Sequence, residues 1–299
     1  MFAVNKDDPL INPYLAVVLA VLAAAFSSIF TKLSTAPPLA IAFYRLLFTV
    51  LMIAPLSLKK EGLKELAGIN ARDLVMALLS GVFLAAHFAV WITSLNYTSI
   101  SSSTVLVTMQ PLFVIAGGML FLGERIRKAG LFGAVLSLAG SVLIGINDFK
   151  VGGMALYGDF LAFSGAIFVA AYFLIGRNLR KKLSLFTYVF LVYGTSAAVL
   201  FWLNLLTGSA LYPYPAADWI WFAALALVPT IFGHTVFNWA LKYVKAAVVS
   251  VSILGEPVGA TILAYFIFGQ IPAVLQVAGG IIIITGLCIF IKSSFGDSR

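Results

Sequence analysis

The sequence predicts an all-α membrane protein with ten transmembrane helices, arranged as two inverted five-helix repeats. Hydrophobic residues make up 62% of the 299-residue chain and charged residues only 10%, whereas a soluble domain has about 25% charged residues. Apolar segments of about 20 residues, the length that spans a bilayer, recur along the whole chain. The second half of the chain also aligns with the first after a shift of 146 residues.

This composition excludes several functional classes. Too few charged side chains are present to cover a soluble enzyme of 32.0 kDa, and the chain is too apolar to be disordered. We expect no nucleic acid as a partner despite the net charge of +8, because the basic residues of a membrane protein gather in cytoplasmic loops. The single cysteine, Cys288, excludes an internal disulfide and a multi-cysteine metal site. The expected partner is the lipid bilayer, and no metal or other cofactor is expected.

The predicted spans follow one another with short loops between them, so neighbouring helices should run antiparallel. They lie at 13–33, 38–58, 73–96, 102–122, 130–147, 158–177, 185–206, 219–241, 246–268 and 273–291. One loop, KKEGLKELAGINARD, is longer than the rest. Its Leu63 and Leu66 predict a short helix on the membrane surface.

The distribution of basic residues predicts the orientation. Of the 19 Lys and Arg residues, 16 fall in the loops and tails on one side of the membrane and two on the other, while Arg45 lies inside a span. By the positive-inside rule, the side with 16 faces the cytoplasm. Both termini are therefore predicted to be cytoplasmic.

The internal repeat predicts the architecture. Shifting the chain by 146 residues aligns the helix-punctuating residues without a gap, namely Pro111 with Pro257, Gly123 with Gly269, Gly133 with Gly279 and Gly140 with Gly286. We expect the first repeat over residues 1–150 and the second over 151–299. Because five spans is an odd number, the second repeat must start on the opposite side of the membrane. Inverted repeats are typical of secondary transporters, which bind their solute near mid-bilayer between the repeats.

The same segments resemble a known family. The first half carries AFYRLLFTVL, QPLFVIAGGMLFLGE and GAVLSLAGSVLI, and the second carries EPVGATILAYFIFGQ and GGIIIITGLCIF. A proline, about a dozen apolar residues, Gly-Glu and then a glycine-rich helix resembles the EamA family of the drug/metabolite transporter (DMT) superfamily, although Gln270 replaces the second Glu. The resemblance implies a multi-pass carrier of the inner (plasma) membrane, often an exporter of amino acids or other small metabolites.

Two polar residues at membrane depth stand before prolines. Glu256 lies about 15 Å into its span at 1.5 Å per residue, and Pro257 after it should bend the helix by freeing a backbone carbonyl. A carboxyl there could load and release a proton or hold the amino group of a solute, or it could be a structural acceptor. Its repeat mate Gln110, before Pro111, could bind a polar solute or form an interhelical hydrogen bond.

Four further residues are predicted to wall the site. Trp91 lies four residues after His87, and Asn238 lies four residues after His234, so each pair shares a helix face. The third helices of the two repeats carry these pairs, and we expect the solute to lie between them. The alternative is that both histidines are packing residues held by hydrogen bonds.

Arg45 and Glu124 are interpreted as structural or gating residues, together with Pro111 and Pro257. Arg45 lies about 10 Å inside its span and could bind a carboxylate or pin neighbouring helices. Glu124 lies among Arg125, Arg127 and Lys128, where an ion pair at a gate or loop is expected. The glycine-rich fifth and tenth spans should pack outside the cavity, because small residues let helices approach closely.

These observations predict a secondary transporter, most simply an exporter of small metabolites such as amino acids, which works by alternating access. The alternative is a facilitative importer or uniporter of small solutes. An intramembrane enzyme or a channel is a remote alternative, because the spans lack a nucleophile–base pair and a continuous polar lining. Protons are a candidate coupling ion. A monomer and a homodimer are both compatible with the sequence.

Overall fold

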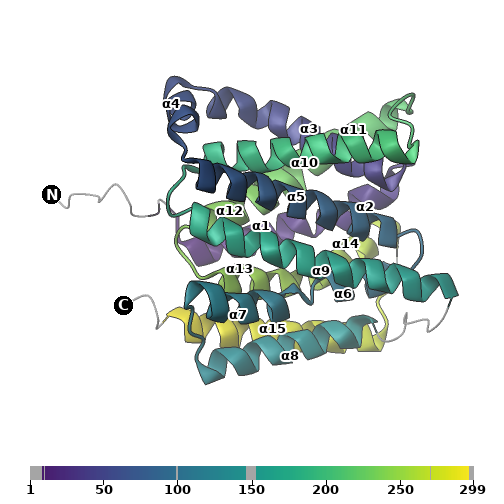
Figure 1. Ribbon diagram of the computed structural model, residues 1–299. Helices are drawn as coiled ribbons and strands as arrows, with labels where there is room; N and C mark the ends of the chain where they lie inside the picture. The colour runs from purple at the N-terminus through teal and green to yellow at the C-terminus, as the bar shows by residue number, and fades with distance from the viewer. Residues whose placement is uncertain (1–8, 10, 99, 146–152, 270, 296–299) are drawn as a thin grey trace.

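The computed structural model describes residues 9, 11–98, 100–145, 153–269 and 271–295, and over these residues every regular element is a helix (Figure 1). Nine of the helical segments in this part of the chain are long and apolar enough to cross a membrane. A further apolar helix, α8 (Lys128–Gly145), is shorter. The all-α, multi-pass class is therefore confirmed, and the short surface helix expected near Leu63 is present as α4 (Lys60–Gly68).

The remaining elements follow the order of the predicted spans. They are α1 (Pro13–Ala24), α2 (Phe26–Leu33), α3 (Pro38–Ser57), α5 (Ala71–Ser94), α6 (Ile100–Val107), α7 (Gln110–Leu122), α9 (Gly153–Leu179), α10 (Leu185–Thr207), α11 (Ala216–Leu225), the π-helix η1 (Ala226–Thr235), α12 (Val236–Ala240), α13 (Ala246–Ser252), the 3₁₀ turn η2 (Ile253–Gly255), α14 (Glu256–Phe268) and α15 (Val274–Phe295).

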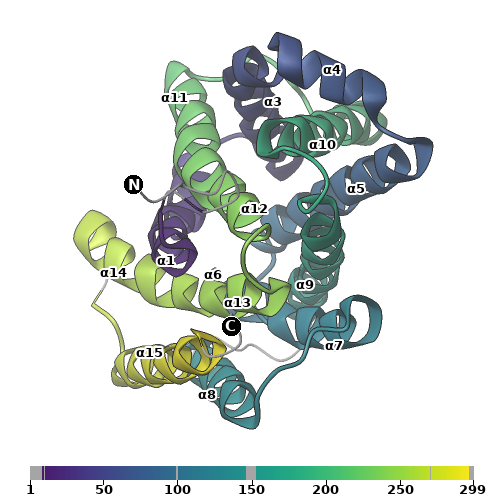
Figure 2. The same ribbon diagram turned by 90° about the vertical axis from the view of Figure 1, so that its left-hand side faces the viewer.

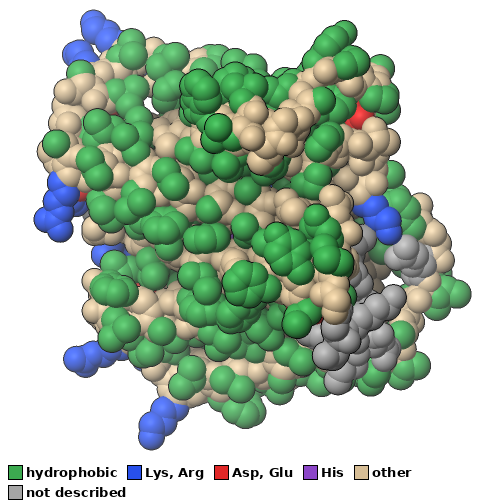
Figure 3. Space-filling model, turned by 45° about the vertical axis from the view of Figure 1, so that its right-hand side comes forward, with side chains coloured by type: hydrophobic (Ala, Val, Ile, Leu, Met, Phe, Trp, Pro, Cys, Tyr) green, Lys and Arg blue, Asp and Glu red, His purple; other side chains and the backbone are tan. Residues whose placement is uncertain are grey.

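The bundle has two distinct ends. At one end α1 begins beside the end of α15, where the hydroxyl of Tyr14 donates to the carbonyl of Ser294 at 3.4 Å. We call this the proximal end and the opposite one, where α2 and α14 end with Lys32 over the Phe268 ring, the distal end. Between the ends the surface is apolar, with Lys and Arg gathered along the proximal edge of the face in Figure 3. Such a band suits contact with lipid tails.

Four of the spans are interrupted at membrane depth. A break at Ala25 separates α1 from α2, and another separates α6 from α7 directly before Gln110 and Pro111. The mate of this second break is the 3₁₀ turn η2, directly before Glu256 and Pro257. Both prolines occupy the first turn of a new helix, where their missing N–H is not needed. The helix expected to bend at Pro257 is therefore interrupted directly before it.

A fourth interruption was not predicted. The eighth span passes through a ten-residue π-helix, η1, which contains Pro229. The hydroxyl of the next residue, Thr230, donates to the carbonyl of Leu225 five residues earlier, at 2.7 Å. Wide turns of this kind are often found at functional sites.

The glycine-rich helices α8 and α15 cross in a way that relates the two repeats. A Cβ added to Gly133 would lie 2.6 Å from the carbonyl oxygen of Gly286, and one added to Gly279 would lie 2.6 Å from that of Gly140. The 146-residue shift maps each of these two contacts onto the other, and the two helices run antiparallel. At the centre, the hydroxyl of Ser137 donates to the carbonyl of its own mate, Ile283, at 3.2 Å. The contacts therefore follow a pseudo-two-fold axis.

The surface helix α4 is held against α10 by one carboxylate. Glu65 accepts hydrogen bonds from the N–H of Ser184, at 2.6 Å, and from the hydroxyl of Thr187, at 2.6 Å. Burial raises the pKa of Glu65, but the hydrogen bonds together lower it by more than burial raises it. The pKa of Glu65 therefore lies below its ordinary value. The contact fixes the start of α10 at the proximal end.

The α8–α15 crossing gives a matched pair of substitutions. Gly279→Ala is expected to lower the free energy of unfolding by about 1–3 kcal/mol, because its methyl group would overlap the backbone of α8. Gly280→Ala is the control, since its methyl group would meet only the Val258 side chain at 3.8 Å. It should be neutral, or stabilising by up to about 1 kcal/mol through helix propensity. Unfolding by sodium dodecyl sulfate in mixed micelles measures both, and equal effects would contradict the close crossing.

Candidate functional site

A small cavity lies at the centre of the bundle, at the depth where the fourth and ninth spans break. Its volume is about 40 Å³, room for about three water molecules. The helices that supply its walls surround the middle of the bundle when it is viewed from the proximal end (Figure 2). Its lining residues are Ala24, Ser27, His87, Phe88, Trp91, Val107, Thr108, Gln110, Val169, Phe173, His234, Phe237, Ile253 and Glu256. We call this the central cavity.

The pseudo-two-fold axis relates the walls of the central cavity to one another. Ten of its 14 lining residues form five pairs related by the 146-residue shift. These pairs are Ser27 with Phe173, Phe88 with His234, Trp91 with Phe237, Val107 with Ile253 and Gln110 with Glu256. The cavity therefore lies between the repeats and is built from both.

Five of the six residues predicted to bind a solute line this cavity: His87, Trp91, Gln110, His234 and Glu256. The sixth, Asn238, does not. Its side-chain NH₂ group donates hydrogen bonds to the hydroxyl of Tyr172, to the hydroxyl of Tyr193 at 3.2 Å and to the carbonyl of His234 at 2.8 Å. Asn238 is fully buried and ties η1 and α12 to α9 and α10, so it supports the wall from behind.

Three buried polar atoms in the described lining of the central cavity have no hydrogen-bond partner. They are the indole Nε1 of Trp91, the amide Oε1 of Gln110 and the imidazole Nδ1 of His234. Each such atom costs about 1–3 kcal/mol when it is removed from water without a partner. Groups of this kind in one cavity call for a partner from outside the chain, such as water or a polar solute.

His87 presents a defined hydrogen-bonding face. Its Nδ1 lies 2.9 Å from the carbonyl oxygen of Gly165, which can only accept, so Nδ1 carries the proton in the neutral ring. The remaining nitrogen, Nε2, is then an acceptor. The ring is almost parallel to that of Trp91, with centroids 6.1 Å apart and an interplanar angle of 9°. The pair forms one aromatic wall with an acceptor beside it.

Glu256 supplies a carboxylate to the central cavity. It is half-buried, and no hydrogen bond or ion pair to it is found among the described residues. Arg45 acts on it electrostatically without forming an ion pair. The two predicted roles of Glu256, as a ligand for an amino group or as a proton site, both need an acceptor that is open to the cavity, and the geometry provides one.

Arg45 lies behind the cavity wall. Its Nε donates to the hydroxyl of Thr230 and its Nη1 to that of Ser27, each at 2.7 Å. The guanidinium carbon lies 4.3 Å from the ring centroid of Phe88. Arg45 is not part of the described lining, and it joins α3 to α2, α5 and η1.

A wide vestibule lies between the central cavity and the distal end, with a volume of about 860 Å³. Neighbouring residues such as Ser27 and Ser28, or Glu256 and Pro257, line the two spaces, so the spaces adjoin. The vestibule is lined by Ser28, Ile29, Thr31, Lys32, Ser34, Ala36, Pro38, Ile41, Ile92, Leu95, Asn96, Thr98, Thr104, Ile144, Pro257, Ala260, Thr261, Ala264, Phe268, Ile271, Pro272 and Gln276.

The prediction that the fifth and tenth spans lie outside the cavity is therefore right at depth and wrong at the mouth. Among the described residues, none of α8 or α15 lines the central cavity, nor does any of α3 or α10. The vestibule, in contrast, has Ile144 of α8 and Gln276 of α15 on its wall. The reason is that the vestibule reaches the distal end, where α8 ends and α15 begins.

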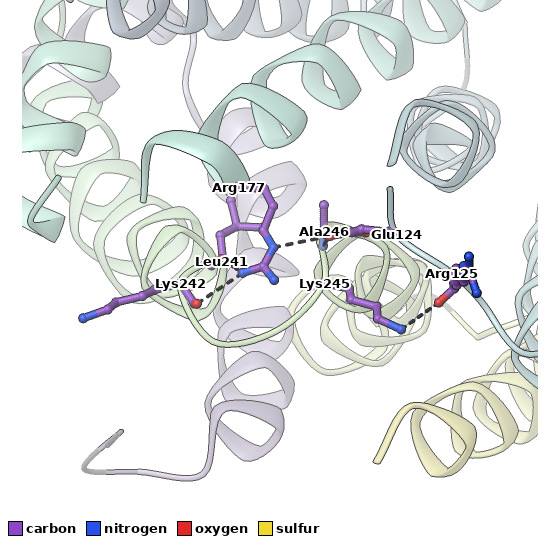
Figure 4. Close-up of polar contacts among 7 residues, drawn as sticks. All are labelled: Glu124, Arg125, Arg177, Leu241, Lys242, Lys245 and Ala246. Carbon is purple, nitrogen blue, oxygen red and sulfur yellow. Dashed lines mark hydrogen bonds and ion pairs between the residues drawn. The ribbon is translucent and has the colours of Figure 1, made fainter. Parts of the chain in front are cut away.

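The proximal end is closed by a contact between the two repeats (Figure 4). Arg177, near the end of α9, lies with its Nε 3.3 Å from Oε1 of Glu124, which follows α7. Its Nη1 donates to the carbonyls of Leu241 at 2.5 Å and Lys242 at 3.2 Å. The same Glu124 oxygen accepts from the N–H of Ala246 at 3.1 Å. We call this arrangement the proximal closure, and it matches the ion pair expected for Glu124.

Sequence reasoning missed the residues that complete the site. From the sequence, Arg177 is interpreted only as a loop cation. Arg177 and Glu124 are 53 residues apart, but each lies near the end of a span on the side predicted to be cytoplasmic, and this could have suggested that they meet. Buried Arg180, whose Nε donates to the carbonyl of Asn238 at 3.0 Å, was missed for the same reason. Phe173 and Phe237 could have been found as the repeat mates of Ser27 and Trp91. Gln270, the mate of Glu124, lies outside the described residues.

Comparison with known proteins gives the same fold over almost the whole chain. The profile of the EamA-like transporter family matches residues 11–146 and again 156–292. The chain is 25% identical to a pseudopaline exporter of Pseudomonas aeruginosa, over 90% of this chain and 93% of that protein. It is 25% identical to a "Probable terminal-alkyne amino-acid exporter" of Streptantibioticus cattleyicolor, over 77% of each. A crystal structure with 17% identity superposes with a TM-score of 0.75, over 93% of this chain and 98% of that one.

The placement of Asn238 leads to a stability prediction. Asn238→Ala should lower the free energy of unfolding by about 1–3 kcal/mol, because the buried hydroxyls of Tyr172 and Tyr193 lose their amide partner. Asn178→Ala removes an exposed amide on the neighbouring helix α9, and it should change stability by less than about 0.5 kcal/mol. Thermal and detergent unfolding of the two variants tests this. A stable Asn238→Ala protein with altered solute choice would instead place Asn238 in the binding site.

Proposed function

We propose, on the premise that this chain belongs to the EamA-like transporter family, that it exports small metabolites such as amino acids by alternating access between inverted repeats. As a member of that family, the chain is a membrane transporter of small molecules and not an enzyme. The observation that carries the proposal is the central cavity, where three unpartnered polar atoms lie between the repeats. A site of this kind at mid-depth suits a solute that approaches from either side in turn.

The two ends of the bundle support alternating access. The central cavity adjoins a wide vestibule at the distal end, whereas the proximal closure covers it at the other end. A carrier needs one end closed while the other is open. The breaks before Gln110 and Glu256 place flexible joints beside the solute, where a change of helix angle would open one end and close the other.

We further propose that α8 spans the membrane as the tenth helix and that the repeats divide at residues 1–150 and 151–299. The antiparallel crossing of α8 and α15 supports the inversion of the repeats. The basic residues of the proximal end support a cytoplasmic location for it and for both termini, in the inner membrane. A reporter fused to the C-terminus that is active only outside the cytoplasm would contradict this orientation.

Each candidate residue has a role in this proposal. Trp91 and His87 hold the apolar body of the solute, Gln110 and His234 pair with its polar groups, and Glu256 binds its amino group or a coupling proton. Asn238 acts by holding the His234 segment in place. Export is favoured over facilitative import because two relatives are described as exporters, of pseudopaline and of a terminal-alkyne amino acid, although another is described as a riboflavin transporter.

Transport by the purified chain in proteoliposomes tests the function. We expect at least one small metabolite to leave liposomes that contain the chain, with saturable kinetics, and to be released faster when the same solute is present on the other side. This trans-stimulation is expected of a carrier and not of a channel. Protein-free liposomes are the control. If no metabolite in a broad screen crosses in either direction, the proposed function is wrong.

The proposed proton site leads to a pH prediction. Glu256→Gln resembles a permanently protonated carboxyl, so it should leave folding intact and flatten the dependence of transport on pH. The reason is that Glu256 is the one carboxylate in the lining of the central cavity. Initial rates between pH 5.5 and 8.5 in proteoliposomes measure the effect. Transport by the wild-type chain that ignores pH, together with full activity of the variant, would make Glu256 structural.

A further inference from the structure

The pseudo-two-fold axis relates the open distal vestibule to the closed proximal end. Applying the 146-residue shift to the vestibule wall converts Thr31 into Arg177, Ser34 into Arg180 and Leu95 into Leu241. It also converts Asn96 into Lys242 and Ala264 into Gly118. These mates are the residues packed in or next to the proximal closure. The residues that would line a vestibule open at the proximal end can therefore be named from the present structure.

The two walls differ in charge. In the described lining of the distal vestibule, Lys32 is the one charged side chain. The mated wall instead carries five basic residues, Arg125, Arg177, Arg180, Lys182 and Lys242. A vestibule that opens at the proximal end would thus concentrate anionic groups from that side, because cations in a low-dielectric cleft focus the field.

We infer that Arg177 is the carboxylate-binding residue of the transport site when the proximal end is open, so that the solute is a small amine that also bears a carboxylate. This inference rests on the proposed function. In the closed end, Glu124 occupies the guanidinium. When the end opens, the carboxylate of the solute replaces that of Glu124.

The present contacts of Arg177 suit such an exchange. Only Nε faces Glu124, at 3.3 Å, which is longer than the 2.7–2.9 Å of a strong charge-assisted bond and is not the two-pronged contact that a guanidinium makes best. The second carboxylate oxygen, Oε2, is buried without a partner. The ion pair that closes the proximal end is therefore weak, and a free carboxylate could form a better one.

The position of Arg177 fits a solute in the central cavity. Arg177 lies one helical turn from Phe173, about 6 Å along α9, and Phe173 lines the cavity. Its side chain is long enough to reach the cavity from the proximal side once its bonds to Leu241 and Lys242 are released. Glu256 supplies an acceptor for the amino group in the same cavity. The two charged ends of an amino acid would then have separate partners.

The predicted orientation of the chain does not explain why Arg177 is buried. The positive-inside rule places cations at the proximal end, but cations that serve only this rule lie in water, as exposed Lys181 does. The Arg177 side chain is only 14% exposed and that of Glu124 only 8%. A buried pair that joins the two repeats has a role in their relative position.

Matched solutes test the inference on the full-length chain in detergent. The probes are four pairs that differ only by the carboxylate: alanine and ethylamine, leucine and isoamylamine, phenylalanine and phenethylamine, tryptophan and tryptamine. The readout is the ratio of the Kd of the amine to the Kd of its amino acid, from the concentration dependence of thermal unfolding. A looser proximal end changes both constants together, so the ratio isolates recognition of the carboxylate.

For the wild-type chain we expect a ratio of about ten or more for at least one pair, since a charge-assisted bond contributes about 1.5–3 kcal/mol. Arg177→Gln should reduce that ratio to about one. Arg177→Lys, which keeps the charge, should reduce it less, and it serves if the Gln variant does not fold. Glu124→Gln removes the competing carboxylate and should raise the ratio. Lys181→Gln is the control and should leave it unchanged.

A wild-type ratio near one, binding of the amines alone, or binding of neither set overturns the inference. So does a ratio that Arg177→Gln and Arg177→Lys both leave intact. These outcomes differ from failure of the proposed function, in which no metabolite at all crosses a proteoliposome membrane. If the chain carries solutes that lack a carboxylate, the transporter proposal stands and the role of Arg177 does not.

Discussion

Arg45 carries a charge at membrane depth, and the groups that make this tolerable also shape the transport site. An unpaired cation there would cost several kcal/mol. Its guanidinium instead bonds to the hydroxyls of Ser27 and Thr230 and lies over the ring of Phe88. Thr230 is available because η1 is a π-helix, and Ser27 because α2 starts anew after the break at Ala25. Three walls of the central cavity are therefore positioned by one buried cation.

The pseudo-two-fold axis explains why the cavity lies where it does. Gln110 and Glu256 each begin a half-helix behind a proline-marked break, at the same depth in opposite repeats. Partial positive charge at the starts of α7 and α14 faces the same region. The close crossing of α8 and α15 keeps the repeats in register from the outside. The unpartnered polar atoms of Trp91, Gln110 and His234 thus lie where both repeats can offer them to one solute.

Much of this was predictable from the sequence, and the failures share a cause. Runs of apolar residues predict the spans, and the paired prolines predict the breaks, because both depend on local chemistry. The place of Asn238 behind the cavity wall could not be predicted because its partners, Tyr172 and Tyr193, lie 66 and 45 residues away. The π-helix was missed because Pro229 alone does not fix how a helix widens. Arg177 resembled a loop cation, since its burial depends on a contact with the other repeat.

The two repeats share a backbone plan but not their charges, and the difference falls at the proximal closure. Glu124 and Arg177 join the repeats at the proximal end. Their mates are Gln270 and Thr31, and neither of these carries a charge, so the same ion pair cannot form at the distal end. Two states related by a symmetric backbone would have equal free energies. Unequal charges remove that equality, and a solute can shift the balance between the two states only by as much as it binds one of them better than the other.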